Sequence, residues 1–356
     1  MSGTSMDGAD AVLIRMNGTH WQGALAHAFT PYPQDLKQRL LDLQDSGYDE
    51  LHRSALLAQE LSTLYAATVN SLLAEQQLTP AQISAIGCHG QTVRHAPESA
   101  YSIQLADLAL LAEKTGIFTV GDFRSRDLAA GGQGAPLVPA FHYALFHNPH
   151  ETRVVLNIGG IANISILPAT GHPFGFDTGP GNMLLDAWTA QHWQQPYDAG
   201  GEKAAQGQIL PELLAVLLAH PYLHQTPPKS TGRDLFSPAW LQGYLKGSEN
   251  PHDVLRTLLE YTAASITGSI NTAGADVQNI YICGGGIHNT ALINRLNEML
   301  APRQLHSTDA LSLNPQWVEA AAFGWLAACW VNRIPGNPHH ATGAGKPCIL
   351  GAGYCA

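Results

Sequence analysis

The chain opens with Met1-Ser-Gly-Thr-Ser-Met-Asp-Gly-Ala-Asp10, and the apolar run Ala11-Val-Leu-Ile14 follows directly. This pattern predicts a polar, glycine-containing turn that leads into a strand over residues 10–16. Two glycines allow positive φ angles and close approach of a ligand to the backbone, and exposed N–H groups suit phosphate oxygens. Asp7 or Asp10 is a candidate cation ligand. Taken alone, the stretch is equally consistent with a surface hairpin turn.

A second glycine turn, Asn157-Ile-Gly-Gly160, lies between two β-branched runs, residues 154–158 and 161–167. Runs of this kind on either side of a Gly-Gly pair predict a β-hairpin. Two glycine turns at the head of two α/β halves indicate a pair of phosphate clamps around one nucleotide. A third glycine segment, Gly284-Gly-Gly286, follows a predicted strand and precedes a predicted helix, and we assign it to the adenosine side of the nucleotide. Neither a P-loop nor a G-x-G-x-x-G fingerprint occurs in the sequence.

The strongest catalytic candidate is Asp177, within Gly175-Phe-Asp-Thr-Gly-Pro-Gly-Asn182. A carboxylate on a rigid loop is what general-base catalysis requires. Asn182 is expected to cap a helix, so that the loop directs N–H groups toward whatever Asp177 faces. The alternative is that Asp177 only organises the turn.

Three further loops carry polar side chains that suit a ligand with many hydroxyl groups: residues 88–94, 122–127 and 228–233. In them, His89 is expected to form hydrogen bonds rather than bind a metal, and Arg124 or Arg126 is a candidate carboxylate ligand. A surface ion pair is the alternative for either arginine. Glu319 heads an apolar helix and faces either the ligand or solvent.

Composition excludes several classes of protein. The chain has 356 residues with 45% hydrophobic and 13% charged residues, as in a compact enzyme. A net charge of −10 without a long Lys/Arg run argues against nucleic-acid and anionic-membrane surfaces. No apolar run reaches the roughly 20 residues of a membrane span. Five widely spaced cysteines and a polar N-terminus favour a reduced, cytoplasmic protein.

The order of elements predicts an α/β fold with ligands at the carboxyl edges of the strands. Helices are expected at residues 33–43, 51–73, 182–188, 254–270, 289–300 and 317–330, and further short strands at 83–87, 117–120 and 280–283.

Several long motifs together resemble the anhydro-N-acetylmuramic acid kinase family, within the sugar-kinase, actin and heat-shock ATPase superfamily. The resemblance runs from end to end of the chain, and it is carried by residues 1–10, 87–95, 122–139, 156–160, 175–188 and 228–233. It implies a two-lobed, actin-like (ribonuclease H-like) α/β fold with a central cleft between the lobes. We expect the lobes at residues 1–130 and 131–334, with the segment from about 335 to 356 returning to the first lobe.

The resemblance also implies the reaction. The family opens the anhydro ring of 1,6-anhydro-N-acetylmuramic acid with water and transfers the γ-phosphoryl group of ATP to O6. The products are N-acetylmuramic acid 6-phosphate and ADP, in peptidoglycan recycling. By this pattern Asp177 is the base that activates the water. A homodimer is expected, with no nucleic-acid or membrane partner.

The site residues that follow fall into three groups. ATP is expected to contact Gly3, Thr4, Ser5, Met6, Asp7, Gly8, Ala9, Asp10, Asn157, Gly159, Gly160, Gly284, Gly285 and Gly286. The sugar is expected to contact His89, Gly90, Gln91, Thr92, Arg126 and Glu319. Asp7 is expected to interact with Mg²⁺, through water.

One departure from the family pattern concerns the first residues. Members usually have several residues before the Met-Ser-Gly-Thr-Ser motif, which form the first strand, whereas this sequence starts at the motif. Either the sequence is clipped or its start site was placed late. If the protein begins at Met1, we expect the phosphate loop to lack half of its hairpin and to bind ATP more weakly. Two competing interpretations are a kinase for another sugar, which a substrate panel would reveal, and a nucleotide-gated assembly protein, which would form filaments with ATP.

Overall fold

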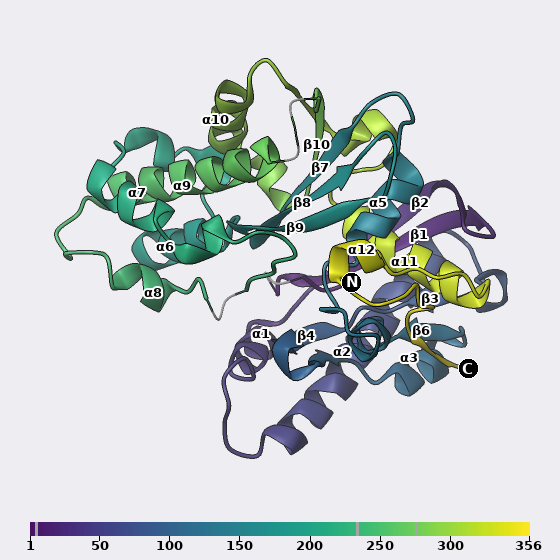
Figure 1. Ribbon diagram of the computed structural model, residues 1–356. Helices are drawn as coiled ribbons and strands as arrows, with labels where there is room; N and C mark the ends of the chain where they lie inside the picture. Colours follow the sequence, from purple (N-terminus) through teal and green to yellow (C-terminus); the bar gives the residue numbers. More distant parts are fainter. Residues whose placement is uncertain (4–5, 233–234, 273, 275) are drawn as a thin grey trace. The chain divides into compact units, whose positions relative to one another are not determined.

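The computed structural model describes residues 1–3, 6–232, 235–272, 274 and 276–356. The chain forms two compact units (Figure 1): unit 1 comprises residues 1–145 and 317–356, and unit 2 comprises residues 146–316. These bounds differ from those of the predicted lobes, because two helices that the prediction gave to the second lobe pack within unit 1. Phe141 of α5 (Val138–Phe146) contacts Trp21 and Trp325, the latter in α11 (Val318–Val331).

Unit 2 is built on a five-stranded mixed sheet in the order β11-β10-β7-β8-β9. The strands are β7 (Arg153–Ile158), β8 (Ile161–Leu167), β9 (Phe174–Pro180), β10 (Asn279–Cys283) and β11 (Gln304–Ser307). Strands β7, β8 and β9 form an antiparallel meander, whereas β10 is parallel to β7 and β11 is parallel to β10. This is the strand order of the ribonuclease H-like fold, so the predicted α/β class is confirmed.

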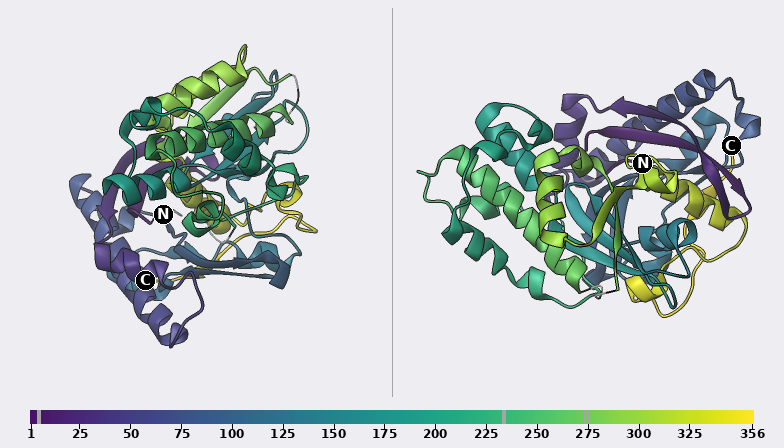
Figure 2. Two further views of the ribbon diagram at one scale, coloured as in Figure 1. Left: turned by 90° about the vertical axis from the view of Figure 1, so that its left-hand side faces the viewer. Right: turned by 90° about the horizontal axis from the view of Figure 1, so that it is seen from above.

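The core of unit 2 lies between this sheet and its helices. The helices are α6 (Met183–Trp193), α7 (Pro211–Leu218), α8 (Pro238–Gln242), α9 (Pro251–Asn271) and α10 (Thr290–Leu300). Short 3-10 turns join them: η3 (Ala199–Gly201), η4 (Ala204–Gln206), η5 (Pro221–His224), η6 (Gly285–His288) and η7 (Thr308–Leu311). Helix α9 is buried along most of its length. It packs against α6, α7 and α10 (Figures 1 and 2).

The described residues of unit 1 form three small sheets. The first is the antiparallel hairpin β1 (Gly8–Asn17) and β2 (His20–Pro31); the second has the order β12-β6-β3; and the third pairs β4 with β5. Their remaining strands are β3 (Ile86–Gly87), β4 (Gln91–Ala96), β5 (Tyr101–Leu105), β6 (Thr119–Gly121) and β12 (Ala352–Tyr354). The C-terminal segment joins this unit because β12 pairs antiparallel with β6.

Helices cover these sheets. They are α1 (Gln34–Leu41), α2 (Glu50–Glu75), α3 (Leu108–Thr115), α4 (Ser125–Ala129), α5, α11 and α12 (His339–Thr342), with the turns η1 (Pro80–Gln82) and η2 (Pro97–Ser99). Helix α2 packs against β1, β2 and α3, and α11 packs against β1 and β3. In the part of the chain that the structure describes, no helix has the length and apolarity to cross a membrane.

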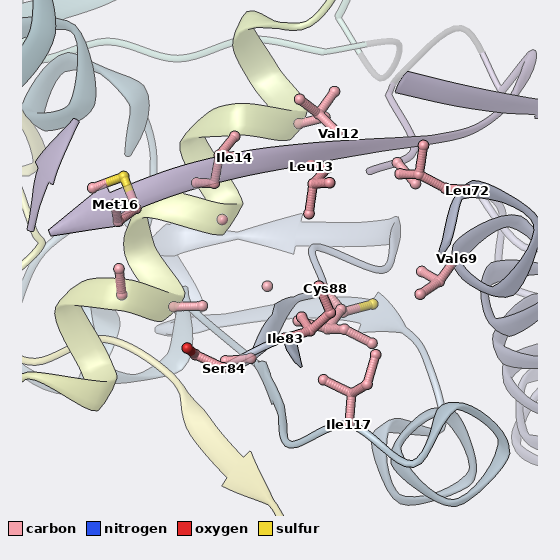
Figure 3. A pocket seen from close by; sticks show the side chains of 18 of the residues that line it. Val12, Leu13, Ile14, Met16, Val69, Leu72, Ile83, Ser84, Cys88 and Ile117 are labelled. Atoms are coloured by element: carbon pink, nitrogen blue, oxygen red, sulfur yellow. The ribbon is translucent and has the colours of Figure 1, made fainter. Parts of the chain in front are cut away.

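A cavity of about 640 Å³ lies within unit 1 between β1 and β3 (Figure 3). It is lined by Val12, Leu13, Ile14 and Met16 of β1, by Val69 and Leu72 of α2, and by Ile83, Ser84, Cys88 and Ile117. Within the described residues, β1 has only β2 as a paired strand, and β3 has only β6.

Met1 marks the beginning of this unpaired edge. The Met1 amino group donates to the Asp10 carbonyl oxygen at 2.7 Å, and the Asp10 N–H donates to the Met1 carbonyl oxygen at 2.9 Å. This pair joins Met1 and Asp10, the two ends of the segment predicted as a turn. Its geometry is antiparallel, so residues placed before Met1 would run along β1 toward Ile14.

We predict that an engineered extension of about six Val and Ile residues before Met1 stabilises unit 1, because these residues favour strands and would fill the cavity. We expect a Tm higher by a few degrees, since each kcal/mol shifts Tm by about 2–4 °C in a domain of this size. Differential scanning calorimetry would measure it, with a Gly-Ser extension of equal length as control. An equal Tm for the two extensions would contradict the prediction.

Candidate active site

Asp177 lies in β9, beside an irregularity of the sheet. Asn163 of β8 pairs with Asp177 and the preceding Ala162 pairs with Gly179, so the register skips Thr178. An extra residue of this kind is a β-bulge, which bends the strand and redirects the neighbouring side chains. Asp177 is partly exposed at this point, whereas Thr178 and Gly179 are buried.

Contacts of the described residues hold both the backbone and the carboxylate of Asp177. The Thr231 N–H donates to the carboxylate oxygen Oδ2 at 2.9 Å, and the Tyr222 hydroxyl donates to the Asp177 carbonyl oxygen at 2.7 Å. The Asp177 N–H donates to the Lys229 carbonyl oxygen at 3.4 Å. Burial, and to a lesser extent the charge of Asp177, raises the pKa of Tyr222, so this hydroxyl keeps its proton and remains a donor.

A row of four residues crosses the sheet at this level. Cys283 of β10 pairs with Asn157 of β7, Asn157 pairs with Asn163, and Asn163 pairs with Asp177. Residues directly opposite one another in antiparallel strands share a face of the sheet. Two strand spacings of about 4.8 Å therefore place the backbone of Asp177 about 10 Å from that of Asn157.

The glycine segments of unit 2 meet at the end of this row. A Cβ on Gly284 would lie 2.3 Å from the Asn157 side-chain oxygen, and one on Gly286 would lie 2.2 Å from Cγ2 of Ile158. Residues 157–160 and 284–286 are therefore side by side, as a shared nucleotide site requires. Gly285 differs from its neighbours: it is exposed, and a Cβ there would meet nothing within 4 Å.

The start of α6 does not supply N–H groups to Asp177 as expected. The N–H groups of Gly181, Asn182 and Met183 donate to the carbonyl oxygens of Gly160, Gly159 and Gly160, respectively, at 2.8–3.1 Å. The Asn182 side chain does not cap the helix either, because its Nδ2 donates to the Ile158 carbonyl oxygen at 3.2 Å. Asn182 is the N-cap residue of α6, as predicted, but its side chain and the first N–H groups of the helix bind the β7–β8 turn instead of capping the helix or facing Asp177.

In unit 1 the N-terminal loop is held by the residues predicted to bind sugar. Gln91 accepts a hydrogen bond from the Ser2 hydroxyl and donates to the Gly3 carbonyl oxygen at 3.3 Å. His89 Nδ1 lies 3.3 Å from the Ser2 carbonyl oxygen, and Arg124 Nη2 lies 3.0 Å from His89 Nε2. Because arginine only donates, Nε2 accepts, and the Nδ1 proton goes to Ser2.

His89 is 7% exposed. Burial, with the charge of Arg124 as a smaller cause, holds the pKa of His89 well below its usual range, so the ring is neutral. The contacts of both ring nitrogens show that His89 links the N-terminal loop to the 122–134 segment, where Arg124 also donates to the Gly134 carbonyl oxygen at 2.7 Å. Its contact with sugar stays a prediction.

The other residues predicted to bind sugar have contacts of their own in unit 1. Glu319, in the first turn of α11, lies near Gly3: a Cβ there would be 3.8 Å from Glu319 Oε2. Gly90 has φ +75° and packs on the Leu105 backbone, as the tight turn before β4 demands. Thr92 accepts a hydrogen bond from Gln104 at 3.2 Å.

The two candidate arginines differ in their surroundings. Arg126 is exposed in α4, whereas Arg124 is the arginine in contact with His89.

The residues predicted to bind phosphate and metal have definite partners in unit 1. The Asp7 carboxylate is exposed and 3.0 Å from Lys37 Nζ, and Asp10 Oδ1 is 2.8 Å from His27 Nε2. Exposed pairs like the first contribute about 0–1 kcal/mol, so a cation could displace Lys37. Met6 and Ala9 are buried in the core, and a Cβ on Gly8 would clash with β2. Thr4 and Ser5 lie outside the described residues.

Metal ligation at the loop would rest on few groups. Across the described ranges, no group of three or more His, Cys, Asp or Glu side chains is arranged to hold a metal ion. Mg²⁺ bound to a nucleotide usually takes only one or two protein carboxylates, together with phosphate oxygens and water. The carboxylates of Asp7 and Asp10 are therefore of the ligand type that such an ion takes.

Four residues near Asp177 were not singled out from the sequence. Asn163 and Tyr222 gave no signal. Lys229 and Thr231 belong to the 228–233 loop and contact Asp177 through their backbones. That this loop binds substrate stays a prediction.

A ribonuclease H-like unit with a carboxylate on one strand and glycine turns at the ends of neighbouring strands defines a class: the phosphotransferases and ATPases of the sugar-kinase and actin-like superfamily. The family model "Anhydro-N-acetylmuramic acid kinase" matches residues 1–356. The anhydro-N-acetylmuramic acid kinase of Neisseria gonorrhoeae is 69% identical over 99% of this chain and 97% of that protein. The chain therefore belongs to the anhydro-N-acetylmuramic acid kinase family.

More distant proteins are also similar. The enzyme of the same name from Nitrosomonas europaea is 50% identical over 100% of this chain and 98% of that protein. Among solved structures, the activator of 2-hydroxyisocaproyl-CoA dehydratase from Clostridium difficile with bound ADPNP aligns with a TM-score of 0.44 at 12% identity, covering 92% of this chain and 97% of that chain. The ROK hexokinase of Thermus thermophilus aligns with a TM-score of 0.32 at 13% identity, covering 84% of this chain and 92% of that chain.

We predict that acid destabilises unit 1 through its buried histidines. Burial lowers the pKa of His142 to about 3 and that of His89 as well, whereas an unfolded histidine titrates near pH 6.5. Below about pH 6.5 the unfolded state binds more protons, so stability present above that pH is lost as the pH falls. The expected loss between about pH 7.5 and 5.5 is about 1.4 kcal/mol per histidine.

Urea unfolding at the two pH values tests this for the wild type and for His142→Gln, whose pH dependence should be smaller by one histidine's share. An unchanged pH dependence in the variant would rule out the role of His142.

Proposed function

We propose that this chain catalyses the ATP-dependent conversion of 1,6-anhydro-N-acetylmuramic acid to N-acetylmuramic acid 6-phosphate, with Asp177 as the general base. Membership of the family over the whole chain supports the reaction. The observation that supports the role of Asp177 is its position on the bulged strand β9, with one carboxylate oxygen held by the Thr231 N–H.

The chemistry of the substrate determines what the base must do. O6 is part of an ether in the anhydro ring, so it has no proton to remove. A base is useful only on the water that attacks the anomeric carbon C1. The water oxygen forms a bond to C1 and gives a proton to Asp177, while the C1–O6 bond breaks. The released O6 then forms the new bond to the γ-phosphorus, and ADP leaves.

The environment of Asp177 suits this role. Hydrogen bonds from Thr231 to the carboxylate and from Tyr222 to the carbonyl oxygen fix its orientation before substrate arrives. A fixed base avoids reorientation at the moment of reaction.

The glycine segments are proposed to hold ATP. The nucleotide would contact the turn at Gly159 and Gly160, the exposed backbone of Gly285, and residues 3–10. Mg²⁺, held by Asp7 through water, would neutralise charge on the transferred phosphoryl group. The sugar would contact the 89–92 segment, Glu319 and one arginine, either Arg126 or Arg124.

Assembly and location follow from the family resemblance alone. We propose a cytoplasmic homodimer, and light scattering of the purified protein would measure its mass.

Replacing Asp177 with Asn is expected to lower kcat about 10²–10⁴-fold, the usual contribution of a general base, while ATP binding stays within about twofold. Asparagine keeps the shape and the bond from Thr231 but cannot take a proton. ADP release with ATP, Mg²⁺ and the anhydro sugar measures kcat, and calorimetric titration measures binding. Asp45→Asn, at an exposed aspartate of unit 1, is the matched control.

Undiminished turnover by Asp177→Asn would contradict the assignment of the base. Release of ADP with other sugars but not with the anhydro sugar would favour the competing sugar-kinase interpretation.

Two glycine variants separate nucleotide contact from packing. Gly285→Ala should leave stability unchanged, because its Cβ meets nothing within 4 Å, yet raise the KM for ATP about tenfold by holding the nucleotide off the backbone. Gly286→Ala should instead lose about 1–3 kcal/mol of stability, because its Cβ would overlap Ile158. An unchanged KM for ATP in Gly285→Ala would remove Gly285 from the nucleotide site.

A further inference from the structure

Lys229 carries a buried ammonium group beside the candidate base. It is 6% exposed. Its Nζ donates to the carbonyl oxygens of Tyr222 at 3.1 Å and Leu223 at 3.2 Å. The same nitrogen lies 4.8 Å from the ring centroid of Tyr222 and 5.5 Å from that of Phe176, which precedes Asp177 in β9.

Burying a charge in this way is costly unless the surroundings compensate it. Here two carbonyl oxygens of the turn η5 and two aromatic faces do so. Burial lowers the pKa of Lys229, and the negative charge of Asp177 opposes that shift. No carboxylate of the described residues lies within ion-pair distance of Lys229 Nζ.

The contacts of Lys229 connect the segments that hold Asp177. The hydroxyl that donates to the Asp177 carbonyl oxygen belongs to Tyr222, whose own carbonyl oxygen is bound by Lys229. The carbonyl oxygen that accepts from the Asp177 N–H belongs to Lys229 itself. Thr231, which donates to the carboxylate, is two residues further along. Removing the ammonium would release η5 from residues 229–231, and both segments contact Asp177.

We propose that Lys229 is a positioning residue, which orients Asp177 by tying η5 to the 229–231 segment and does not itself contact the substrate. This inference rests on the proposed function, because it presumes that Asp177 is the base. It accounts for a buried lysine whose Nζ donates to two backbone carbonyl oxygens of η5.

Lys229→Met keeps the aliphatic stem but removes the three donors and the charge. We expect kcat to fall about tenfold or more, with the KM for ATP within about twofold of wild type, because the nucleotide contacts other residues. Lys203→Met is the matched control. Lys203 also lies over an aromatic ring, 5.9 Å from the centroid of Trp193, but its Nζ bonds to Gln195, away from Asp177. Its kcat should not change.

A second variant separates positioning from a general loss of structure. Lys229→Ala leaves a space for a small amine, so added ethylammonium should restore part of kcat, while tetramethylammonium, which cannot donate a hydrogen bond, should not. A wild-type kcat for Lys229→Met would overturn the inference. So would a loss of kcat in Lys229→Ala that ethylammonium does not restore, since it would show a merely structural role.

The double variant distinguishes this inference from the proposed function. If Lys229 acts through Asp177, adding Lys229→Met to Asp177→Asn lowers kcat no further, because both changes remove the same contribution. Full turnover by Asp177→Asn alone would defeat the assignment of the base. An inactive Asp177→Asn beside a fully active Lys229→Met would defeat only the role of Lys229.

Discussion

The pairing of β7 with β8 and β10 is the interaction on which the candidate site of unit 2 depends. Strand β7 is the buried centre of the sheet, with Val154, Leu156 and Ile158 fully excluded from solvent. Its register aligns Asn157 with Cys283 on one side and with Asn163 on the other, and Asn163 in turn aligns with Asp177. One ladder of backbone hydrogen bonds thus sets the spacing between the glycine turns and the candidate base. A shift of one residue would turn these side chains to the opposite face.

Glycine makes the close approach at the end of β7 possible. A side chain at Gly181, Gly284 or Gly286 would lie 2.2–2.3 Å from atoms of residues 157–159. The same contacts explain why α6 begins where it does, since its first N–H groups are bound to the carbonyl oxygens of Gly159 and Gly160. In unit 1, the side chains of His89 and Gln91 hold the backbone of the N-terminal loop at Ser2 and Gly3.

The sequence predicted the elements whose signal is local. The two β-branched runs around Gly159-Gly160 became β7 and β8, and the apolar periodicity of residues 254–270 became α9. Strand β2, residues 20–31, was not predicted, because its three alanines and one glycine lower its strand propensity. The α/β class and the family were also correct, the family through long motifs rather than through local physics.

Roles that depend on tertiary contacts could not be predicted from the sequence. Nothing local distinguishes Arg124, which contacts His89, from the exposed Arg126 two residues later. Asparagine is a residue type common at helix N-caps, but the Asn182 side chain donates to the Ile158 carbonyl oxygen. The links from Tyr222, Lys229 and Thr231 to Asp177 span about 45 to 54 positions in the chain, and only the fold brings them together.

The central claim is that water activated by Asp177 attacks C1, and that O6 of the sugar attacks the phosphorus. Turnover in H₂¹⁸O, followed by mass spectrometry of the sugar phosphate, tests it most directly. The account predicts one ¹⁸O in the hydroxyl group at C1 and none in the phosphate group, after correction for exchange in product incubated in labelled water. Label in the phosphate group would mean that water attacks phosphorus, and would contradict the account.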